Sequence, residues 1–279
     1  MVLWCVVGAG RGVAGSGPLS ACTSANAVWG VDFKGWFRTG DGARCDPLSV
    51  SDLYSRYVIR LQAVERCDTA SVWPVLEAAF REHGRPRAMR SDNGPPFASS
   101  GVGGLSRLAV RLIKAGVVPE RIAPGKPQQN GRHERLHLTV GQETASPPAA
   151  NRRAQQRRFD RFRRLFNEER PHEALAQSVP ADHYNPPARP WDGQLREPDY
   201  ADGTAVRRVR SNGEIKWGGE LVFLGEALVG EPVGLAATDQ DGLWLVSYGP
   251  VALATIDADG KLHRVTGACP RDPQTKPPG

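Results

Sequence analysis

The sequence predicts an α/β domain with a mixed sheet and flanking helices, followed by a small all-β barrel domain. Up to residue 178, strand-like runs alternate with amphipathic helical segments, which is typical of α/β folds. Beyond Trp191, short strand-like runs are separated by Asn-Gly and Asp-Gly turns, which is typical of small β domains. With 279 residues, 40% of them hydrophobic, the chain can bury a core in one large domain or two modest ones.

The elements of the α/β part follow one another at short intervals. Strand-like apolar runs lie at residues 28–37, 47–51, 57–64, 87–90 and 117–122. Amphipathic helices are expected at residues 69–83, 105–115 and 151–170, and from Pro127 onward. Asp68 can cap the first of these helices, and Gly84 can end it. The first three strands form an antiparallel meander, and the later strands alternate with helices, so we expect helices on both faces of a mixed sheet.

The domain boundaries are predicted from changes in composition. We expect a disordered lead-in at 1–26, the α/β core at 27–178, a Pro-rich linker at 179–190, the β-barrel at 191–265 and a disordered tail at 266–279. The lead-in is rich in Gly, Ala and Ser, and the tail is rich in Pro. Within the barrel, strands are expected at 204–209, 214–217, 221–224, 233–237, 243–248 and 251–256.

Charge and cysteine usage limit the functional classes. The chain carries 36 Lys and Arg against 30 Asp and Glu, a net charge of +6, which mildly favours a polyanionic partner. Its five cysteines are scattered and never form Cys-x-x-Cys, so neither a disulfide framework nor a zinc ribbon is indicated. The apolar run Val2–Val7 is too short for a membrane span or an ordinary signal segment. We therefore expect a cytoplasmic protein with no membrane partner.

Three carboxylates stand at the ends of separate predicted elements: Asp32 in the first strand, Asp92 just past the strand at 87–90, and Glu134 early in the helix after Pro127. Open α/β sheets place their chemistry at the carboxyl ends of strands. Hard cations such as Mg²⁺ or Mn²⁺ take carboxylate oxygens, and two of them about 4 Å apart serve phosphodiester chemistry. Each acid alone could be a solvated carboxylate, and Asp92-Asn93-Gly94 could be a plain turn. Taken together, the three acids predict one metal site.

The surrounding motifs resemble those of bacterial insertion-sequence transposases with an integrase-type DDE catalytic core, a branch of the retroviral integrase superfamily. The resemblance rests on Asp32-Phe33-Lys34-Gly35, Ser91-Asp92-Asn93-Gly94 and the segment 125–135, which reads GKPQQNGRHER. The segment 166–175, FNEERPHEAL, resembles the part of the family that follows the catalytic helix.

The resemblance implies a ribonuclease-H-like fold in which Asp32, Asp92 and Glu134 bind two Mg²⁺ (or Mn²⁺) ions. It implies cleavage and transfer of DNA strands, in which a water and then a DNA 3′ hydroxyl attack phosphodiesters without a covalent protein intermediate. The implied partners are double-stranded DNA, as element ends and target, and further copies of the chain assembled on that DNA. The implied location is the bacterial cytoplasm, at the nucleoid.

Two departures from the family pattern affect this interpretation. The interval between Asp92 and Glu134 is several residues longer than is usual, and the extra length falls in Gly-rich loops that tolerate insertion. No helix-turn-helix region precedes the core in this sequence, so we expect recognition of element ends to be missing from it. A catalytically silent DNA-binding remnant of a transposase is therefore the alternative function.

A competing motif lies in the same helix, because residues 133–137 read His-Glu-Arg-Leu-His, the zinc-protease pattern. That pattern needs a third ligand, for which only a distant acid such as Glu168 is available. The two histidines also follow a helical repeat with Leu136 and Val140, which favours packing on the inner face of the helix. The protease interpretation leaves Asp32 and Asp92 unexplained.

Basic residues predict where DNA would lie. Phosphate contacts are expected from Lys34, Lys126, Arg132 and Arg135 around the three acids, and from Arg153, Arg157, Arg161 and Arg164 on the helix at 151–170. Such contacts position DNA without reading its sequence. On the barrel, the candidates for an accessory DNA-binding or assembly role are Arg207, Arg208, Arg210 and Lys216. The alternative for the barrel is a domain that only packs or oligomerises.

Overall fold

The computed structural model describes residues 19–123, 131–185 and 189–263, and groups them into two compact units. The α/β unit comprises Ser20–Phe97 and Ala115–Gln194. The β unit comprises Ala98–Lys114 and the described chain from Leu195 onward. The segment 98–114 thus packs with the β unit, whereas we predicted a division near residue 191 alone. No helix among the described residues has the length and apolar character needed to cross a membrane.

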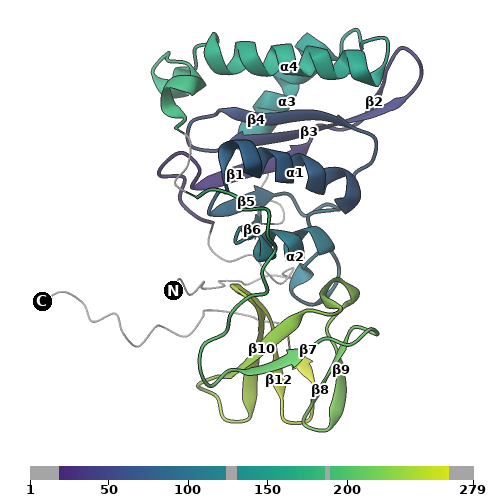
Figure 1. The fold of residues 1–279 in the computed structure, drawn as a ribbon, viewed down its shortest axis with the longest axis vertical. Coiled ribbons are helices and arrows are strands. Elements are labelled where there is room, and N and C mark those ends of the chain that lie inside the picture. The colour runs from purple at the N-terminus through teal and green to yellow at the C-terminus, as the bar shows by residue number, and fades with distance from the viewer. Residues whose placement is uncertain (1–18, 124–130, 186–188, 264–279) are drawn as a thin grey trace, which may run out of the picture. The chain divides into compact units, whose positions relative to one another are not determined.

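The α/β unit contains a six-stranded mixed sheet (Figure 1). Its strands are β1 (Val28–Phe33), β2 (Phe37–Arg38), β3 (Arg44–Asp52), β4 (Val58–Val64), β5 (Ala88–Ser91) and β6 (Val118–Arg121). The order is β2-β3-β1-β5-β6, with β4 paired to β3. The meander β1-β3-β4 is antiparallel, and β5 and β6 continue the sheet in parallel to β1. The predicted mixed sheet is confirmed, but the run at 28–37 forms two strands, because the chain turns through Gly35 at φ 95°.

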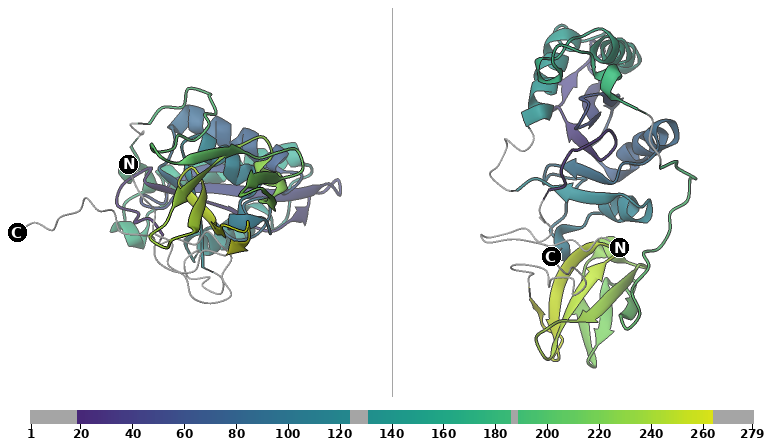
Figure 2. Two further views of the ribbon diagram at one scale, coloured as in Figure 1. Left: turned by 90° about the horizontal axis from the view of Figure 1, so that it is seen from below. Right: turned by 90° about the vertical axis from the view of Figure 1, so that its left-hand side faces the viewer.

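Helices lie on both faces of this sheet, as the edge-on view in Figure 2 shows. They are α1 (Thr69–His83), α3 (Gly131–Thr144) and α4 (Arg152–Glu168). Successive residues of β1 point to opposite faces. Trp29 meets Phe80 of α1, with ring centroids 5.8 Å apart, whereas Gly30 faces His133 of α3. The predicted signals of α1 are confirmed, since Asp68 accepts a hydrogen bond from Ser71 N and the helix ends at Gly84.

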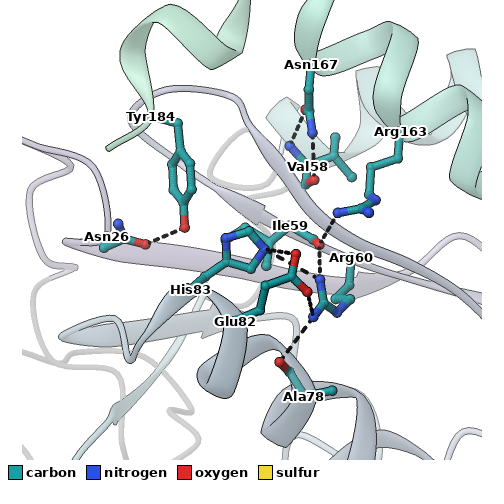
Figure 3. A network of polar contacts seen from close by, with 10 residues as sticks. All are labelled: Asn26, Val58, Ile59, Arg60, Ala78, Glu82, His83, Arg163, Asn167 and Tyr184. Atoms are coloured by element: carbon teal, nitrogen blue, oxygen red, sulfur yellow. Dashed lines mark hydrogen bonds and ion pairs between the residues drawn. The ribbon is translucent and has the colours of Figure 1, made fainter. Parts of the chain in front are cut away.

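Two side-chain amides of α4 form hydrogen bonds with the backbone of the outer strand β4, and Figure 3 shows the one from Asn167. Asn167 accepts from Val58 N and donates to Val58 O, at 2.8 and 3.0 Å, so it replaces a missing neighbouring strand. About three turns upstream, Gln156 accepts from Ala63 N and donates to Leu61 O. These bonds satisfy backbone groups that an unpaired edge would expose. The same face of α4 buries its apolar stripe of Phe159, Phe162 and Phe166.

The segment after α4 also packs on the α/β unit. It contains two short 3-10 helices, η3 (Glu173–Leu175) and η4 (Pro180–His183). Tyr184 donates to Asn26 Oδ1 (Figure 3). Its ring stacks on that of Tyr57, with ring centroids 4.2 Å apart. Arg189 donates to the carbonyls of Pro86 and Gly116. The described parts of the predicted linker at 179–190 are therefore anchored. The start of the expected lead-in and the expected tail lie outside the described residues, and within 19–26 the side chain of Asn26 is buried.

The β unit is an antiparallel β domain completed by one helix. Its strands are β7 (Ala205–Arg208), β8 (Glu214–Trp217), β9 (Glu220–Phe223), β10 (Pro232–Ala237), β11 (Leu243–Tyr248), β12 (Val251–Asp257) and β13 (Leu262–His263). Five strands form a sheet in the order β13-β12-β11-β10-β7, and β8 pairs with β9. Helix α2 (Arg107–Lys114) places Ala109 and Ile113 in the same apolar core as Val233, and the unit also holds the short 3-10 helices η1 (Val102–Gly104) and η5 (Glu226–Leu228).

Candidate active site

Two of the three predicted acids lie at the same level on neighbouring strands. β1 and β5 run parallel, and Gly30 is the register partner of Arg90. Asp32 and Asp92 each follow two residues after this pair, at the carboxyl ends of their strands. Asp32 shares the face of Gly30, which α3 covers. The fold thus brings two residues 60 positions apart in the sequence to one end of the sheet.

The backbone around Asp92 forms a tight turn. Gly94 N donates to Asp92 Oδ1 at 3.1 Å, and Asn93 donates to Ile122 O at 2.9 Å, which ties the turn to the chain following β6. A Cβ at Gly94 would lie 3.0 Å from Asp92 Oδ2, so glycine leaves the carboxylate uncrowded. The plain-turn and metal-ligand interpretations of this motif are compatible, because the turn holds the carboxylate in one orientation.

Glu134 occupies the first turn of α3, where its side chain is exposed. Among the described residues, one group offers three ligand atoms that all lie within 4.8 Å of one another, and it consists of Asp32, His133 and His137. Asp92 and Glu134 are not part of this group. The structure therefore aligns Asp32 with Asp92 along the sheet and places the histidines of α3 beside Asp32, but does not gather the three predicted acids as closely.

Both histidines lie on the inner face of α3, as the packing interpretation predicts. His133 is buried between Ser49 and Ser51 of β3, whose hydroxyls lie 3.3 Å from Nδ1 and 3.2 Å from Nε2. His137 places Nε2 2.7 Å from Ser49 Oγ and Nδ1 4.0 Å from Asp32 Oδ2. Burial lowers the pKa of His133 to about 3 and that of His137 to about 4, with the Lys34 charge also lowering the latter. Both rings are therefore neutral at pH 7.

Ser49 and Ser51 are not among the site residues predicted from the sequence. A signal for them exists, because β3 reads Leu-Ser-Val-Ser at 48–51 in the middle of a central strand, where alternate positions are usually apolar. Small hydroxyl residues at every second position predict polar partners on one face of the sheet. Gly30 gives a second signal, since a Cβ there would lie 2.1 Å from His133 Nε2.

The predicted phosphate-contacting residues near the site are only partly described. Lys34 lines a cleft of about 490 Å³ together with His137, Leu138 and Gly141. Arg135 is exposed on α3. Lys126 lies outside the described residues, and so does the side chain of Arg132.

The four arginines predicted on α4 form one exposed stripe, which we call the arginine stripe: Arg153, Arg157, Arg161 and Arg164. At 100° per residue they fall within an arc of about 80°, opposite the phenylalanines, and span roughly 16 Å of helix. No ion pair with any of the four occurs within the described ranges. The other arginines of the segment are engaged, for example Arg152 with Glu65 at 3.0 Å and Arg163 with Ile59 O at 3.1 Å.

The candidate cations of the β unit have different settings. Arg208 is paired with Glu197 at 2.9 Å, and Arg210 is exposed. Arg207 lies 5.6 Å over the ring of Trp217, and with Lys216 and Trp244 these residues line a cleft of about 530 Å³. Arg207 and Lys216 therefore remain available for the predicted accessory role.

Comparison with known protein families shows which family the chain belongs to. Residues 23–127 and 115–180 each match an integrase core domain, and together these matches span more than half of the chain. Residues 204–262 match the C-terminal domain of IS481 family transposases. The chain belongs to the integrase-core transposases. This family membership argues against a zinc protease. The suggested third ligand Glu168 is exposed and lies outside the histidine group, in which Asp32 is the acid beside the two histidines.

Two curated proteins that are similar to this chain come from insertion elements. It is 28% identical over 158 residues to the insertion element IS407 uncharacterized 31.7 kDa protein of Burkholderia multivorans, covering 56% of this chain and 54% of that protein. It is also 28% identical over 164 residues to the insertion element IS476 uncharacterized 39.2 kDa protein of Xanthomonas euvesicatoria, covering 58% and 45%. The chain thus spans about half the length of the curated relatives it matches.

The structural comparison also matched chains from retroviral integrase structures. One is the simian T-cell lymphotropic virus intasome in complex with the PP2A regulatory subunit B56 gamma, with TM-score 0.48, 17% identity, and 94% of this chain and 85% of that chain covered. Another is the catalytic core domain of BIV integrase, with TM-score 0.44, 16% identity, and 57% and 94% covered.

Proposed function

We propose that the chain cleaves DNA strands and joins them to new sites, as a Mg²⁺-dependent (or Mn²⁺-dependent) polynucleotidyl transferase. The observation that carries this proposal is the placement of Asp32 and Asp92 at one level on adjacent parallel strands of an integrase core. Carboxylates at this position offer the oxygen ligands that Mg²⁺ prefers. Asp32, Asp92 and Glu134 would hold the ions, with Glu134 brought in by α3.

In this proposal the bound metal ions activate the reacting groups, and basic side chains position the DNA. When bound, two Mg²⁺ ions supply Lewis-acid activation of the attacking oxygen and neutralise charge on the leaving oxygen. A water oxygen attacks the first phosphodiester, and the freed 3′ hydroxyl then attacks the target phosphodiester, so no protein side chain becomes covalently attached. The exposed arginine stripe of α4 offers cations that can hold backbone phosphates in register. Arg135 and Lys34 lie closer to the acids along the chain.

The wider assignment follows from the same activity. We propose double-stranded DNA, as element ends and as target, as the partner, and an assembly of several copies on that DNA in the bacterial nucleoid. The predicted boundaries of a catalytic core at 27–178 and a β domain at 191–265 remain part of this proposal, with the segment 98–114 assigned by its packing to the β unit.

The decisive experiment replaces Asp92 with asparagine. We expect Asp92→Asn to lower Mg²⁺-dependent cleavage and joining of a duplex that ends in the element's terminal sequences by at least about 100-fold, because it removes a charged ligand from the metal site. Asp241→Asn, in an exposed turn of the β unit, is the matched control and should keep wild-type activity. Undiminished cleavage by Asp92→Asn would refute the assignment.

A second candidate is a protein that binds DNA without cutting it. It is favoured by one observation, namely that the close group around Asp32 contains two histidines in place of Asp92 and Glu134. This candidate predicts DNA binding that depends on the arginine stripe, with no Mg²⁺-dependent or Mn²⁺-dependent turnover in the wild-type chain.

A further inference from the structure

The two histidines of α3 are unexplained by the proposed phosphodiester chemistry. They stand four residues apart on a helix, which places both imidazoles on one face. That face is turned to the sheet, and the acid it meets there is Asp32. A buried and a partly buried imidazole beside a carboxylate can serve as a ligand set, because Zn²⁺ binds two histidines and one carboxylate in many sites.

We propose that Asp32, His133 and His137 form a binding site for a transition-metal dication such as Zn²⁺, which shares only Asp32 with the proposed Mg²⁺ site. Their ligand atoms lie within 4.8 Å of one another, and His137 Nδ1 is 4.0 Å from Asp32 Oδ2. Ligands of a tetrahedral Zn²⁺ lie roughly 3.4 Å apart, given metal–ligand distances of about 2.0–2.1 Å. Small side-chain rotations therefore close the site.

Serine hydroxyls of β3 already lie within hydrogen-bonding distance of both imidazole rings, as the partners of ligating histidines often do. A ligating histidine usually has its second nitrogen fixed by a hydrogen-bonding partner. Ser51 Oγ lies 3.2 Å from His133 Nε2, and Ser49 Oγ lies 2.7 Å from His137 Nε2. His137 thus keeps Nδ1 for a cation. His133 Nδ1 also lies 3.3 Å from Ser49 Oγ, so a cation bound at this nitrogen would displace that serine contact.

The backbone leaves room for the ring of His133, and a cleft connects His137 with solvent. Gly30 provides the room for His133, since any Cβ at that position would collide with the ring. His137 lines the cleft of about 490 Å³, which gives a path from solvent. Lys34 lines the same cleft, and its charge opposes cation binding, so we expect moderate affinity.

The choice of metal follows from the ligand types. Imidazole nitrogen suits Zn²⁺ and similar transition metals, whereas Mg²⁺ takes oxygen ligands and dehydrates reluctantly. Asp32 belongs to both ligand sets. A Zn²⁺ ion held by the histidines therefore withdraws this carboxylate from Mg²⁺, so the ion should inhibit strand cleavage. The inhibition rests on the proposed function, whereas the binding does not.

The binding test uses Co²⁺ as a spectroscopic substitute for Zn²⁺. We expect the metal-free chain to bind Co²⁺ with a tetrahedral visible spectrum that Zn²⁺ abolishes. His137→Gln and Asp32→Asn should weaken Co²⁺ binding by at least about tenfold, as loss of a ligand requires. Both side chains are partly exposed, at 11% and 14%, so these variants disturb the core less than a change of the fully buried His133. Glu134→Gln should bind Co²⁺ like the wild type.

A folding control accompanies each variant. Zn²⁺ should raise the thermal midpoint of the wild type, because a ligand of the native state stabilises it, and should leave His137→Gln unchanged. His263→Gln, in the β unit, controls for surface histidines and should retain both effects. If Co²⁺ gives only an octahedral spectrum, or binds His137→Gln as tightly as the wild type, the proposal is overturned.

Activity measurements separate this proposal from the function on which its inhibitory part depends. In an active chain, Zn²⁺ should inhibit Mg²⁺-dependent cleavage, and His137→Gln should need at least about tenfold more Zn²⁺ for the same fractional inhibition. Co²⁺ binding without any DNA cleavage would leave the metal site standing and refute the proposed function. Cleavage without Co²⁺ binding would do the reverse.

Discussion

Helices α3 and α4 follow each other in the chain and contact the same sheet, but they use their inner faces differently. The inner face of α4 carries three phenylalanines and two amides that pair with β4, so it serves packing alone. The inner face of α3 has two apolar residues, Leu136 and Val140, and gives its other positions to His133 and His137. The inner face of α4 is thus occupied by packing residues, whereas part of the inner face of α3 is occupied by the two polar histidines. This comparison can be tested by substitution.

The largest expected effect is on the packing of α4. Phe159 is fully buried, and Phe159→Ala should lower the free energy of unfolding by about 3–5 kcal/mol. Val140→Ala, at an equally buried position of α3, removes fewer atoms and should cost about 2 kcal/mol. Chemical denaturation of both variants measures the difference. Equal losses would mean that α3 depends on apolar packing as much as α4 does.

The next effect concerns the amide pair of Asn167. Asn167→Ala leaves both the N–H and the C=O of Val58 without their partner, in a buried place, which should cost about 2–4 kcal/mol. Asn167→Asp is the matched variant, because it keeps the size and the acceptor for Val58 N but places a buried carboxylate oxygen against Val58 O, and it should cost at least as much as alanine at pH 7. Thermal unfolding gives the order. If both variants matched the wild type, the edge of β4 would be satisfied by water.

Much of this fold could be predicted because its signals are local. The cap at Asp68, the stop at Gly84 and the bounds of β8 and β11 are each encoded within a few residues. The level of Asp32 and Asp92 also follows from strand placement alone, since parallel strands end together. The packing of α2 in the β unit could not be read in this way, because it depends on apolar contacts between Ile113 and residues more than 100 positions later.

At the candidate site, too, the contacts of the histidines depend on residues that are remote in the sequence. The pattern at 133–137 predicts that both rings share one helix face, and this is confirmed, since both rings lie within 3.3 Å of Ser49 Oγ. Which residues meet that face depends on the register between β1 and β3, where Asp32 is the partner of Ser49. Register is a property of the assembled sheet, so neither the serine contacts nor the approach to Asp32 was predictable from the helix.

The smallest effect on stability, and the sharpest contrast between the two faces of α4, is expected from the arginine stripe. Replacing Arg153, Arg157, Arg161 and Arg164 with glutamine should change the free energy of unfolding by less than about 0.5 kcal/mol, because exposed substitutions away from packing contacts cost little. DNA binding should weaken, and the slope of log affinity against log salt should fall by up to about 3.6, at about 0.9 for each lost phosphate contact.

A charge-matched variant decides whether position on α4 matters. Replacing four exposed arginines elsewhere in the α/β unit, Arg38, Arg66, Arg81 and Arg87, changes the net charge by the same amount. Fluorescence anisotropy of a labelled duplex across a salt series compares the two variants. If DNA follows the stripe, only the α4 variant loses the slope, since counterions are released where phosphates are contacted. Equal losses would show that net charge alone attracts DNA, and the outer face of α4 would then be an ordinary solvated surface.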